Sequence, residues 1–388
     1  MKPLLLSLFI LGFATLCTNA QPWQPKWEHV SGNQNQDYFA DITETSECFV
    51  VLGSVENNNI SNLNLLCYNK TGELIWNKTF DSNQSEYPSK IVSTPNGDLV
   101  ILSQINADEQ SQIIIRKTDL SGNEINHTSL NGMYFKGSDI AVLNENEWVV
   151  AGAKGTDANH LQLWMAKMDE KGNVAWEKTF GEISNGCFST IKKLPDGGFV
   201  LGGQVAGKAK NDCDMIVIRT DPEGNALWTN HMNAPKSKEW TECVCCSPDS
   251  CFMLVGWGDT CLNDMNDEYP IFDFDLILKK VNCNGKVKWT KNFDSEGSEG
   301  GNAIAIRPDG HFIVAGTKVS SFSGKVGPWL MEVDGNGKLL NELLLDIKYS
   351  RACKVLNTSD GGFVVIGPGF HENLTPRSDG WIISFNEM

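Results

Sequence analysis

The chain has 388 residues, and its 48 acidic against 32 basic side chains give a formal net charge of −16. This acidic balance, with no cluster of Lys and Arg, argues against a surface that follows a phosphate backbone, so nucleic acid is not expected as a partner. An apolar fraction of 41% is too high for a disordered chain.

Residues 1–20 have the features of a secretory signal peptide. Lys2 supplies the positive charge, residues 4–13 form an apolar run, and residues 18–20 offer small or modest side chains at a cleavage position. The run is too short to cross roughly 30 Å of hydrocarbon, and no other stretch approaches that length. We expect a mature chain, 21–388, that is secreted and extracellular, without a transmembrane anchor.

Two further features fit an oxidising compartment. Removal of Cys17 with the signal leaves eleven of the 12 cysteines, more than a reduced cytosolic protein usually carries. Sequons of the form N-x-S/T predict glycosylation at Asn59, Asn69, Asn77, Asn83, Asn126, Asn357 and Asn373. Together these features favour a eukaryotic secretory route over a bacterial periplasm.

An internal repeat decides the predicted fold. A Gly-x-x-x-Trp segment occurs at 72–76, 172–176, 224–228 and 285–289, and it alternates with an Asp-Gly-x-Phe segment at 196–199, 309–312 and 360–363. The large apolar residue of the second segment recurs after 50, 49, 51, 53, 60 and 51 residues, at Phe49, Leu99, Trp148, Phe199, Phe252, Phe312 and Phe363.

Each period holds four short runs of strand composition. In the fourth period these runs are 187–193, 199–204, 215–219 and 226–230. Asp-Gly and Gly-Asn in the connecting turns supply the positive φ that tight hairpins need. Four antiparallel strands in a repeat of about 50 residues are typical of a β-propeller blade. Helical periodicity never persists for the roughly ten to twelve residues that a helix needs.

The two ends of the chain predict how the ring closes. The chain stops at the third-strand position of unit seven, 381–385, and the missing fourth strand is found at 27–30, beginning with Trp27. Their pairing removes two exposed sheet edges, which favour aggregation. We expect one all-β domain, a seven-bladed β-propeller with four antiparallel strands per blade, in which the N-terminal strand completes blade 7. A row of β-sandwiches is the alternative, but it suits seven in-phase copies less well.

The two repeated segments resemble the secreted β-propeller repeats of bacterial extracellular proteins, which are akin to the quinoprotein-like propellers. The resemblance covers 27–385 and implies a fold, with Trp27, Trp76, Trp176, Trp228 and Trp289 docking one blade on the next, but it implies no reaction. Quinoprotein dehydrogenases have an adjacent cysteine pair, to which Cys245-Cys246 is similar, but they have eight blades. Their acid, Asn and base set has no match at the corresponding positions here, so no cofactor of that kind is predicted.

The variable loops predict the binding surface. In a propeller, the second-to-third loops and the links between blades share one face, which we call the loop face, and here the longest are 258–271, 318–327 and 368–378. Variable loops on a rigid ring usually carry binding. The inner strands should line the channel with Phe39, Ser89, Ser138, Ser189, Glu242, Asn302 and Cys353. The candidate ligand-binding residues are Trp240, Glu242, Trp257, Asp259, Asp264, Asp267 and Asn302.

The blade 5 segment also concentrates carboxylates and cysteines. Asp264, Asp267 and Glu268 are oxygen ligands of the kind that calcium takes, although their spacing is not that of an EF-hand, and a solvated acidic loop is the alternative. Exported cysteines favour disulfides over zinc. The expected pairs are Cys48 with Cys67, Cys243 with Cys261, and Cys246 with Cys251.

These features predict a secreted, glycosylated binding module that presents its loop face, chiefly blades 5 to 7, to a glycan or an extracellular protein. One alternative is an extracellular enzyme, a hydrolase, lyase or quinoprotein-like protein, whose residues converge at the channel mouth; Glu242, Asn302 and Asp139 are its candidates. A storage or matrix protein is the third interpretation.

Overall fold

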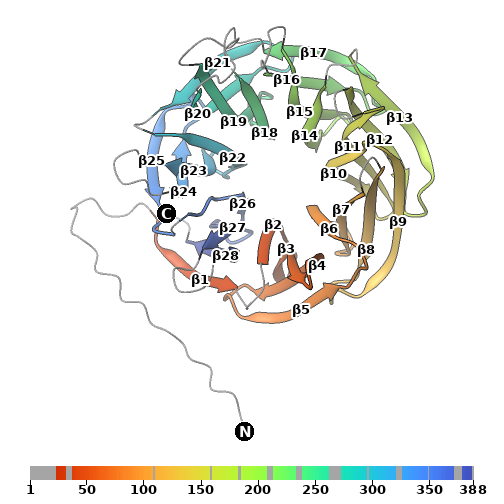
Figure 1. Ribbon diagram of the computed structural model, residues 1–388. Helices are drawn as coiled ribbons and strands as arrows, with labels where there is room; N and C mark the ends of the chain where they lie inside the picture. Colours follow the sequence, from red (N-terminus) through yellow and green to blue (C-terminus); the bar gives the residue numbers. More distant parts are fainter. Residues whose placement is uncertain are drawn as a thin grey trace.

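The computed structural model describes residues 23–31, 37–107, 110–157, 160–181, 185–207, 213–232, 238–261, 272–294, 297–319, 326–347, 349–370 and 378–386. Within these ranges the regular elements are all β-strands, and there is no helix long and apolar enough to span a bilayer. The strands form seven four-stranded antiparallel sheets around a central axis (Figure 1). The seven-bladed β-propeller is therefore confirmed, whereas the expected signal, 1–20, lies outside the described residues.

The first four blades follow one another along the chain. Blade 1 comprises β2 (Asp37–Glu44), β3 (Cys48–Asn57), β4 (Ile60–Asn69) and β5 (Leu74–Phe80). Blade 2 comprises β6 (Glu86–Ser93), β7 (Leu99–Ala107), β8 (Gln110–Thr118) and β9 (Glu124–Met133). Blade 3 comprises β10 (Lys136–Asn144), β11 (Glu147–Gly155), β12 (Leu161–Asp169) and β13 (Val174–Phe180). Blade 4 comprises β14 (Cys187–Lys193), β15 (Phe199–Ala206), β16 (Cys213–Thr220) and β17 (Ala226–Met232), close to the predicted bounds.

The remaining blades complete the ring. Blade 5 comprises β18 (Glu239–Cys246), β19 (Phe252–Cys261), β20 (Phe272–Val281) and β21 (Val287–Phe293). Blade 6 comprises β22 (Glu299–Ile306), β23 (Phe312–Val319), β24 (Val326–Val333) and β25 (Leu339–Leu344). Blade 7 comprises β26 (Lys354–Asn357), β27 (Phe363–Phe370), β28 (Ser378–Phe385) and, from the other end of the chain, β1 (Pro25–Ser31). In each blade the first strand lines the axis and the fourth forms the rim (Figure 1).

The N-terminal strand closes the ring as predicted. β1 runs antiparallel to β28, with Val30 opposite Trp381. Just before β1, the buried Trp23 packs edge-on against Phe363, with ring centroids 5.4 Å apart. A shared core joins the first and last blades, because Ile366 and Ile382 pack with Val51.

Glycines with positive φ explain why the Gly-x-x-x-Trp segment recurs. Gly224 ends the turn between β16 and β17 at φ +78°, and a Cβ there would lie 2.9 Å from the ring of Trp176 in the preceding blade. The left-handed conformation and the close approach both favour glycine. The same contact joins Trp27 to Gly72, Trp76 to Gly122, Trp228 to Gly285 and Trp289 to Gly337. The predicted docking of blade on blade by tryptophan is thus confirmed.

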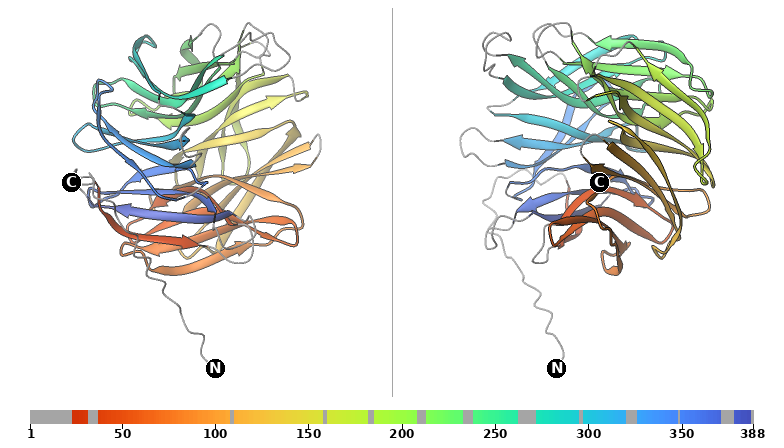
Figure 2. Two further views of the ribbon diagram at one scale, coloured as in Figure 1. Left: turned by 60° about the vertical axis from the view of Figure 1, so that its left-hand side comes forward. Right: turned by 45° about the vertical axis from the view of Figure 1, so that its right-hand side comes forward.

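The hydrophobic core lies between the blades. One cluster, for example, joins Val149 and Met165 of blade 3 to Phe188 and Leu201 of blade 4. Figure 2 shows from two further directions how the twisted sheets stack round the ring. Each blade is buried on both faces by its neighbours. The two ends of the axis, one of which is the loop face, are therefore left to carry a binding site.

Candidate functional site

Six of the inner strands carry a β-bulge at the same position. The register with the second strand shifts between Phe39 and Asp41 in β2 and between Thr241 and Cys243 in β18. The same shift occurs in β6, β10, β14 and β22. The bulged residues are Ala40, Ser89, Ser138, Ser189, Glu242 and Asn302. A bulge re-aims a side chain without ending the strand, and this position is therefore where the repeat can vary what it presents to the axis.

The prediction that Phe39 lines the channel was wrong. Phe39 is buried and packs against Gly380 of blade 7, and Ala40 is the bulged residue of β2. The cause is a β2–β3 turn that is one residue shorter than in the next blade, since Glu44 pairs with Phe49 but Ser93 pairs with Leu99.

Four of the bulged residues line a common cavity of about 220 Å³. It lies at the loop-face end of the axis, because it is reached by the first residues of the inner strands and by Trp257 near the end of β19. Its polar lining residues are Tyr38, Ser89, Glu242, Asn302, Arg351 and Lys354. The structure thus brings Glu242, Trp257 and Asn302 together, as the sequence predicted, and adds residues from blades 1 and 7.

Glu242 is the carboxylate of this cavity. Burial raises the pKa of its carboxyl group, and the positive charges of Lys354, Lys136 and Arg351 partly oppose that rise. Glu242 therefore takes up a proton at higher pH than an exposed glutamate does, and its neutral form can donate a hydrogen bond.

Arg351 precedes the short strand β26 and faces blade 1 across the cavity. Its guanidinium hydrogen-bonds to the side chains of Tyr38 and Cys353. Burial raises the pKa of both Tyr38 and Cys353, so each is neutral near pH 7. The guanidinium consequently has two neutral partners and retains its positive charge toward the cavity.

Asn302 and Trp257 supply the amide and the aromatic ring. The Asn302 Nδ2 donates to the backbone oxygen of Ala352 at 2.8 Å, which orients the amide and leaves its Oδ1 as an acceptor. The Trp257 ring lies over Gly300, where a Cβ would come within 2.8 Å of it. The indole Nε1 of Trp257 is buried and has no hydrogen-bond partner in the described part of the chain. Trp23 and Trp148 in the core have the same unpartnered donor, so this atom does not by itself mark a ligand site.

The other ligand residues expected from the sequence lie elsewhere or outside the described residues. Trp240 pairs with Trp257 across β18 and β19, and the rings of both contact Phe274. Asp259 is buried, and its Oδ1 accepts the Lys238 backbone N–H at 2.9 Å. Asp264, Asp267 and Glu268, the expected calcium ligands, lie outside the described residues, as do most of the loops 258–271, 318–327 and 368–378.

Two expected disulfides are incompatible with the strand register. Cys243 pairs with Val255, and Cys261 lies six residues farther along β19, roughly 20 Å away, which is beyond the reach of a disulfide. Cys246 pairs with Phe252, and Cys251 is the residue before it. Because side chains alternate between the faces of a strand, Cys246 and Cys251 point to opposite faces. Both pairings are wrong.

The third pair lies on adjacent strands. Cys48 and Cys67 are buried thiols in the structure, and they hydrogen-bond to each other. The bond lowers the pKa of Cys48 to about 7 and raises that of Cys67. No disulfide is formed between the described cysteines, so this pairing stays a prediction.

The expected glycosylation sites differ in access. Asn59, Asn77 and Asn83 are exposed, and Asn69 and Asn126 are partly exposed. The Asn357 Nδ2, the atom that a glycan would modify, donates to the Ile306 backbone oxygen, so glycosylation there requires this bond to break. Asn373 lies outside the described residues.

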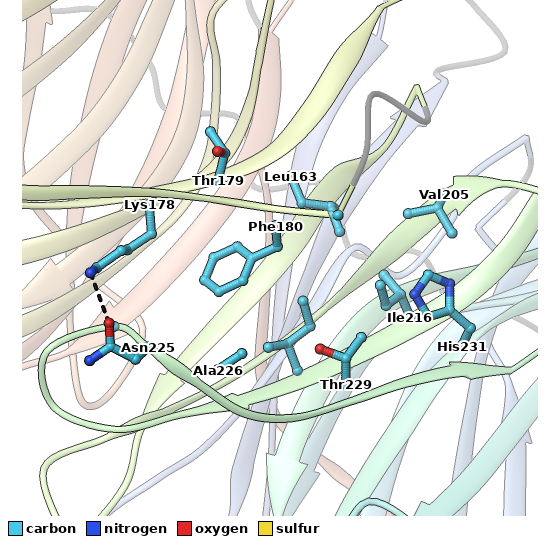
Figure 3. A pocket seen from close by; sticks show the side chains of 13 residues that line it. Leu163, Lys178, Thr179, Phe180, Val205, Ile216, Asn225, Ala226, Thr229 and His231 are labelled. Carbon is cyan, nitrogen blue, oxygen red and sulfur yellow. Dashed lines mark hydrogen bonds between the residues drawn. The ribbon is translucent and has the colours of Figure 1, made fainter.

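A larger cavity, of about 520 Å³, lies between blades 3 and 4. Figure 3 shows its aliphatic and aromatic walls, which include Leu163, Phe180 and Ile216. Lys178 donates to Asn225 Oδ1 at 2.9 Å (Figure 3), so these two polar groups of the wall satisfy each other. We interpret this cavity as a packing gap between neighbouring rim strands, and the channel-mouth cavity as the candidate site.

Two groups of metal-ligand side chains lie away from the cavity. Asp309, His311 and Glu332 form one, and Asp275, Asp294 and Glu299 form the other; in each, the ligand atoms lie within 4.8 Å of one another. Calcium prefers six to eight oxygen ligands. The first group includes an imidazole, and the second supplies three carboxylates, so neither by itself makes a calcium site.

Comparison with known proteins shows the fold and nothing finer. No protein-family model matches the chain, and no curated protein matches its sequence. The WD40 domain of Neurospora crassa Pan2 has a TM-score of 0.55 at 10% identity, over 96% of this chain and 98% of that one. The extracellular domain of a putative one-component system from B. thetaiotaomicron has a TM-score of 0.50 at 11% identity. The match covers 93% of this chain but only 40% of that protein.

A third structure, the β-propeller domain of the Trilobed protease from Pyrococcus furiosus, has a TM-score of 0.46 at 13% identity, over 89% of this chain and 93% of that one. At such low identity, the likenesses to the first two structures establish only a β-propeller. Function must therefore be argued from the cavity.

Proposed function

We propose that this protein is a secreted binding module that recognises a glycan at the loop-face mouth of its channel. The cavity offers an aromatic edge, a carboxyl group, an amide and two cationic groups, which together suit a small ligand with many hydroxyl groups. Its volume of about 220 Å³ corresponds to about seven water molecules at roughly 30 Å³ each. One sugar unit is of this size, so the ligand would insert a single terminal residue of a glycan.

The convergence of an aromatic ring with a carboxyl group, an amide and two cations on one small cavity is the observation that carries this proposal. These groups belong to Trp257, Glu242, Asn302, Arg351 and Lys354, which are far apart in the sequence and meet at the mouth of the channel. A cavity with an apolar ring and a few converging polar groups is typical of a small-molecule binding site.

The cavity favours binding over glycoside hydrolysis. Hydrolysis of a glycosidic bond generally needs two carboxyl groups that flank it, and Glu242 is the one carboxyl group among the described residues of the lining. Asp139, the other carboxylate suggested for an enzyme, accepts backbone N–H bonds from Ile140 and Ile191, each at 2.9 Å. Both of its oxygens are thus engaged, and Oδ2 holds β10 to β14.

A glycan array with a matched pair of variants tests the proposal. Trp257→Leu removes the aromatic ring from the cavity wall, and we expect at least a tenfold loss of binding. Trp148→Leu is the control, because Trp148 lies in the core between blades 2 and 3 and does not line the cavity. Unchanged binding by Trp257→Leu, or no glycan bound by the wild type, would refute the proposal.

Secretion, glycosylation of the accessible sequons, and calcium binding by Asp264, Asp267 and Glu268 remain predictions. Intact-mass measurement of protein from the native source checks the first two through loss of 1–20 and the added glycan mass. Calorimetric titration with calcium checks the third.

A further inference from the structure

The charges around the channel mouth are opposite in sign to those of the whole chain. The chain carries a net charge of −16. Among the described residues that line the cavity or act on its Glu242, three are cations, Lys136, Arg351 and Lys354. Glu242 is the carboxylate of the lining, and the neighbouring inner strands carry two more, Asp41 and Asp139.

Two of the three carboxylates already have close partners. Asp41 is buried, lies 3.2 Å from the Lys90 ammonium, and accepts the Ile91 backbone N–H at 2.9 Å. Asp139 is held by two backbone N–H groups, as described above. These carboxylates fasten one inner strand to the next, and only Lys90 is neutralised by a direct ion pair.

The three cations have no direct ion pair. In the described part of the chain, no carboxylate lies within 4.0 Å of Lys136, Arg351 or Lys354 to form a salt bridge. The positive charges of all three act on Glu242. Like charges held together repel one another, so an anion bound among them would relieve that repulsion.

We infer that the ligand is anionic, a sugar unit that carries a carboxylate, such as a uronic acid residue. This inference rests on the proposed function, since it specifies the glycan bound by the same cavity. The carboxylate would lie between Arg351 and Lys354, because a guanidinium fork pairs with a planar carboxylate through two parallel bonds. Arg351 is oriented for this by its bonds to Tyr38 and Cys353.

The remaining groups of the cavity distinguish a sugar from a bare anion. The ring of Trp257 offers an apolar wall, and the Asn302 amide, held by its bond to the Ala352 oxygen, offers its Oδ1 as an acceptor. Glu242 is a third hydrogen-bonding group on the same wall. A hydroxylated ring with one carboxylate meets all of these requirements at once, whereas inorganic phosphate meets only the charge requirement.

Calorimetric titration of the full mature chain with galacturonic acid, galactose and inorganic phosphate tests the inference. We expect galacturonic acid to bind at least tenfold more tightly than galactose, with an affinity that falls as NaCl rises from about 0.05 to about 0.5 M. Equal affinity for galactose would overturn the anionic ligand but leave the glycan-binding proposal standing. Equal affinity for phosphate would overturn the sugar.

Two variants test whether Arg351 and Lys354 bind the carboxylate of the ligand. Arg351→Gln and Lys354→Gln should each weaken galacturonic acid binding at least tenfold and weaken galactose binding far less, because galactose carries no charge. Lys286→Gln is the control, because Lys286 is an exposed lysine in the β20–β21 turn, on the opposite face from the cavity. An equal loss in all three variants would mean that net charge alone acts, and the inference would fail. Binding of neither sugar by the wild type would reject the proposed function as well.

Discussion

Cys48 and Cys67 in blade 1 occupy the two strand positions that Asp98 and Lys117 occupy in blade 2. In each blade the first residue precedes the large apolar anchor of the second strand, and the other lies opposite the residue after that anchor. Asp98 and Lys117 form an ion pair at 3.5 Å. Glu147 and Lys167 do so at 3.1 Å in blade 3, and His311 contacts Glu332 at 3.0 Å in blade 6. These blades thus keep a side-chain link between the second and third strands, but the types of side chain that form the link differ from blade to blade.

We predict that Cys48 and Cys67 form a disulfide when the protein is exposed to oxidised glutathione. The Cys48 thiolate, whose pKa is lowered to about 7 by the Cys67 thiol, attacks the glutathione disulfide and releases one glutathione. Cys67 then displaces the second glutathione, so two protein thiols are oxidised and one glutathione disulfide is reduced. Closing this loop should stabilise the fold by about 3 kcal/mol. Non-reducing peptide mapping and urea unfolding, with and without reductant, measure both effects.

The variant Cys246→Ser provides the control for this disulfide. Cys246 points to the opposite face of its blade from Cys251, so its loss should leave the effect of reductant on stability unchanged. Cys48→Ser should abolish that effect. A peptide map that links Cys48 to any residue other than Cys67 would contradict the assignment.

The pH dependence of ligand binding should report Glu242. Its pKa is raised by burial, and Lys354, Lys136 and Arg351 face it, with neutral Tyr38 and Cys353 on the same wall. In the pH range where Glu242 titrates, which lies above that of an exposed glutamate, Glu242 becomes neutral as pH falls while a sugar carboxylate stays ionised. Affinity for galacturonic acid should therefore rise as pH falls. Glu242→Gln should bind tightly throughout this range and lose most of the dependence; a slope unchanged in this variant would exclude Glu242 as its origin.

Gly285 and Gly310 form a matched pair that isolates the tryptophan contact between blades. Both have positive φ, +82° and +87°, but a Cβ at Gly285 would lie 2.7 Å from the Trp228 ring, whereas a Cβ at Gly310 meets nothing within 4 Å. Gly310→Ala should cost about 1 kcal/mol through backbone strain alone. Gly285→Ala should cost at least about 1 kcal/mol more, as expected for overpacking. Urea unfolding measures the difference, and equal losses would mean that the ring moves aside freely.

Asp259 should destabilise the fold at neutral pH. Burial raises the pKa of its carboxyl group from 3.8 to about 6, and the Glu239 charge adds to the rise, while a hydrogen bond from the Lys238 backbone opposes it. For a raised acid pKa, the stability present below pH 3.8 is lost as pH rises toward 6. Asp259→Asn should thus gain about 1–2 kcal/mol at pH 7 and almost nothing near pH 3.5. A gain of equal size at both pH values would rule out ionisation as the cause.

The fold could be predicted from the sequence because every blade repeats its own turn chemistry. The glycine of the third-to-fourth turn, followed four residues later by tryptophan in four of the blades, marks both the strand ends and the contact with the neighbouring blade. Trp27 has the position of a fourth-strand tryptophan but precedes the first complete blade. It therefore indicated that the N-terminal strand closes the ring. No long-range information beyond this periodicity was needed.

The site could be predicted only where it follows the repeat. Glu242 and Asn302 were found because they share the bulged position. Arg351 and Lys354 were missed, since the inner strand of blade 7 is reduced to four residues, Lys354–Asn357, and the chain before it is irregular. Their positive charge in an acidic protein, just ahead of the anchor Phe363, was the available signal. The predicted pairs Cys243 with Cys261 and Cys246 with Cys251 were wrong. They were based on proximity along the chain, without the strand register and the alternation of side chains across each strand.

The bulges separate what this molecule recognises from what keeps it folded. Each bulged residue is left out of the ladder to its second strand, so its side chain can be exchanged while that ladder remains intact. An engineer could install a new set of groups at these positions, one blade at a time, and retain the parent melting temperature. Specificity in this architecture is consequently a modular property, decided by single residues that different blades contribute.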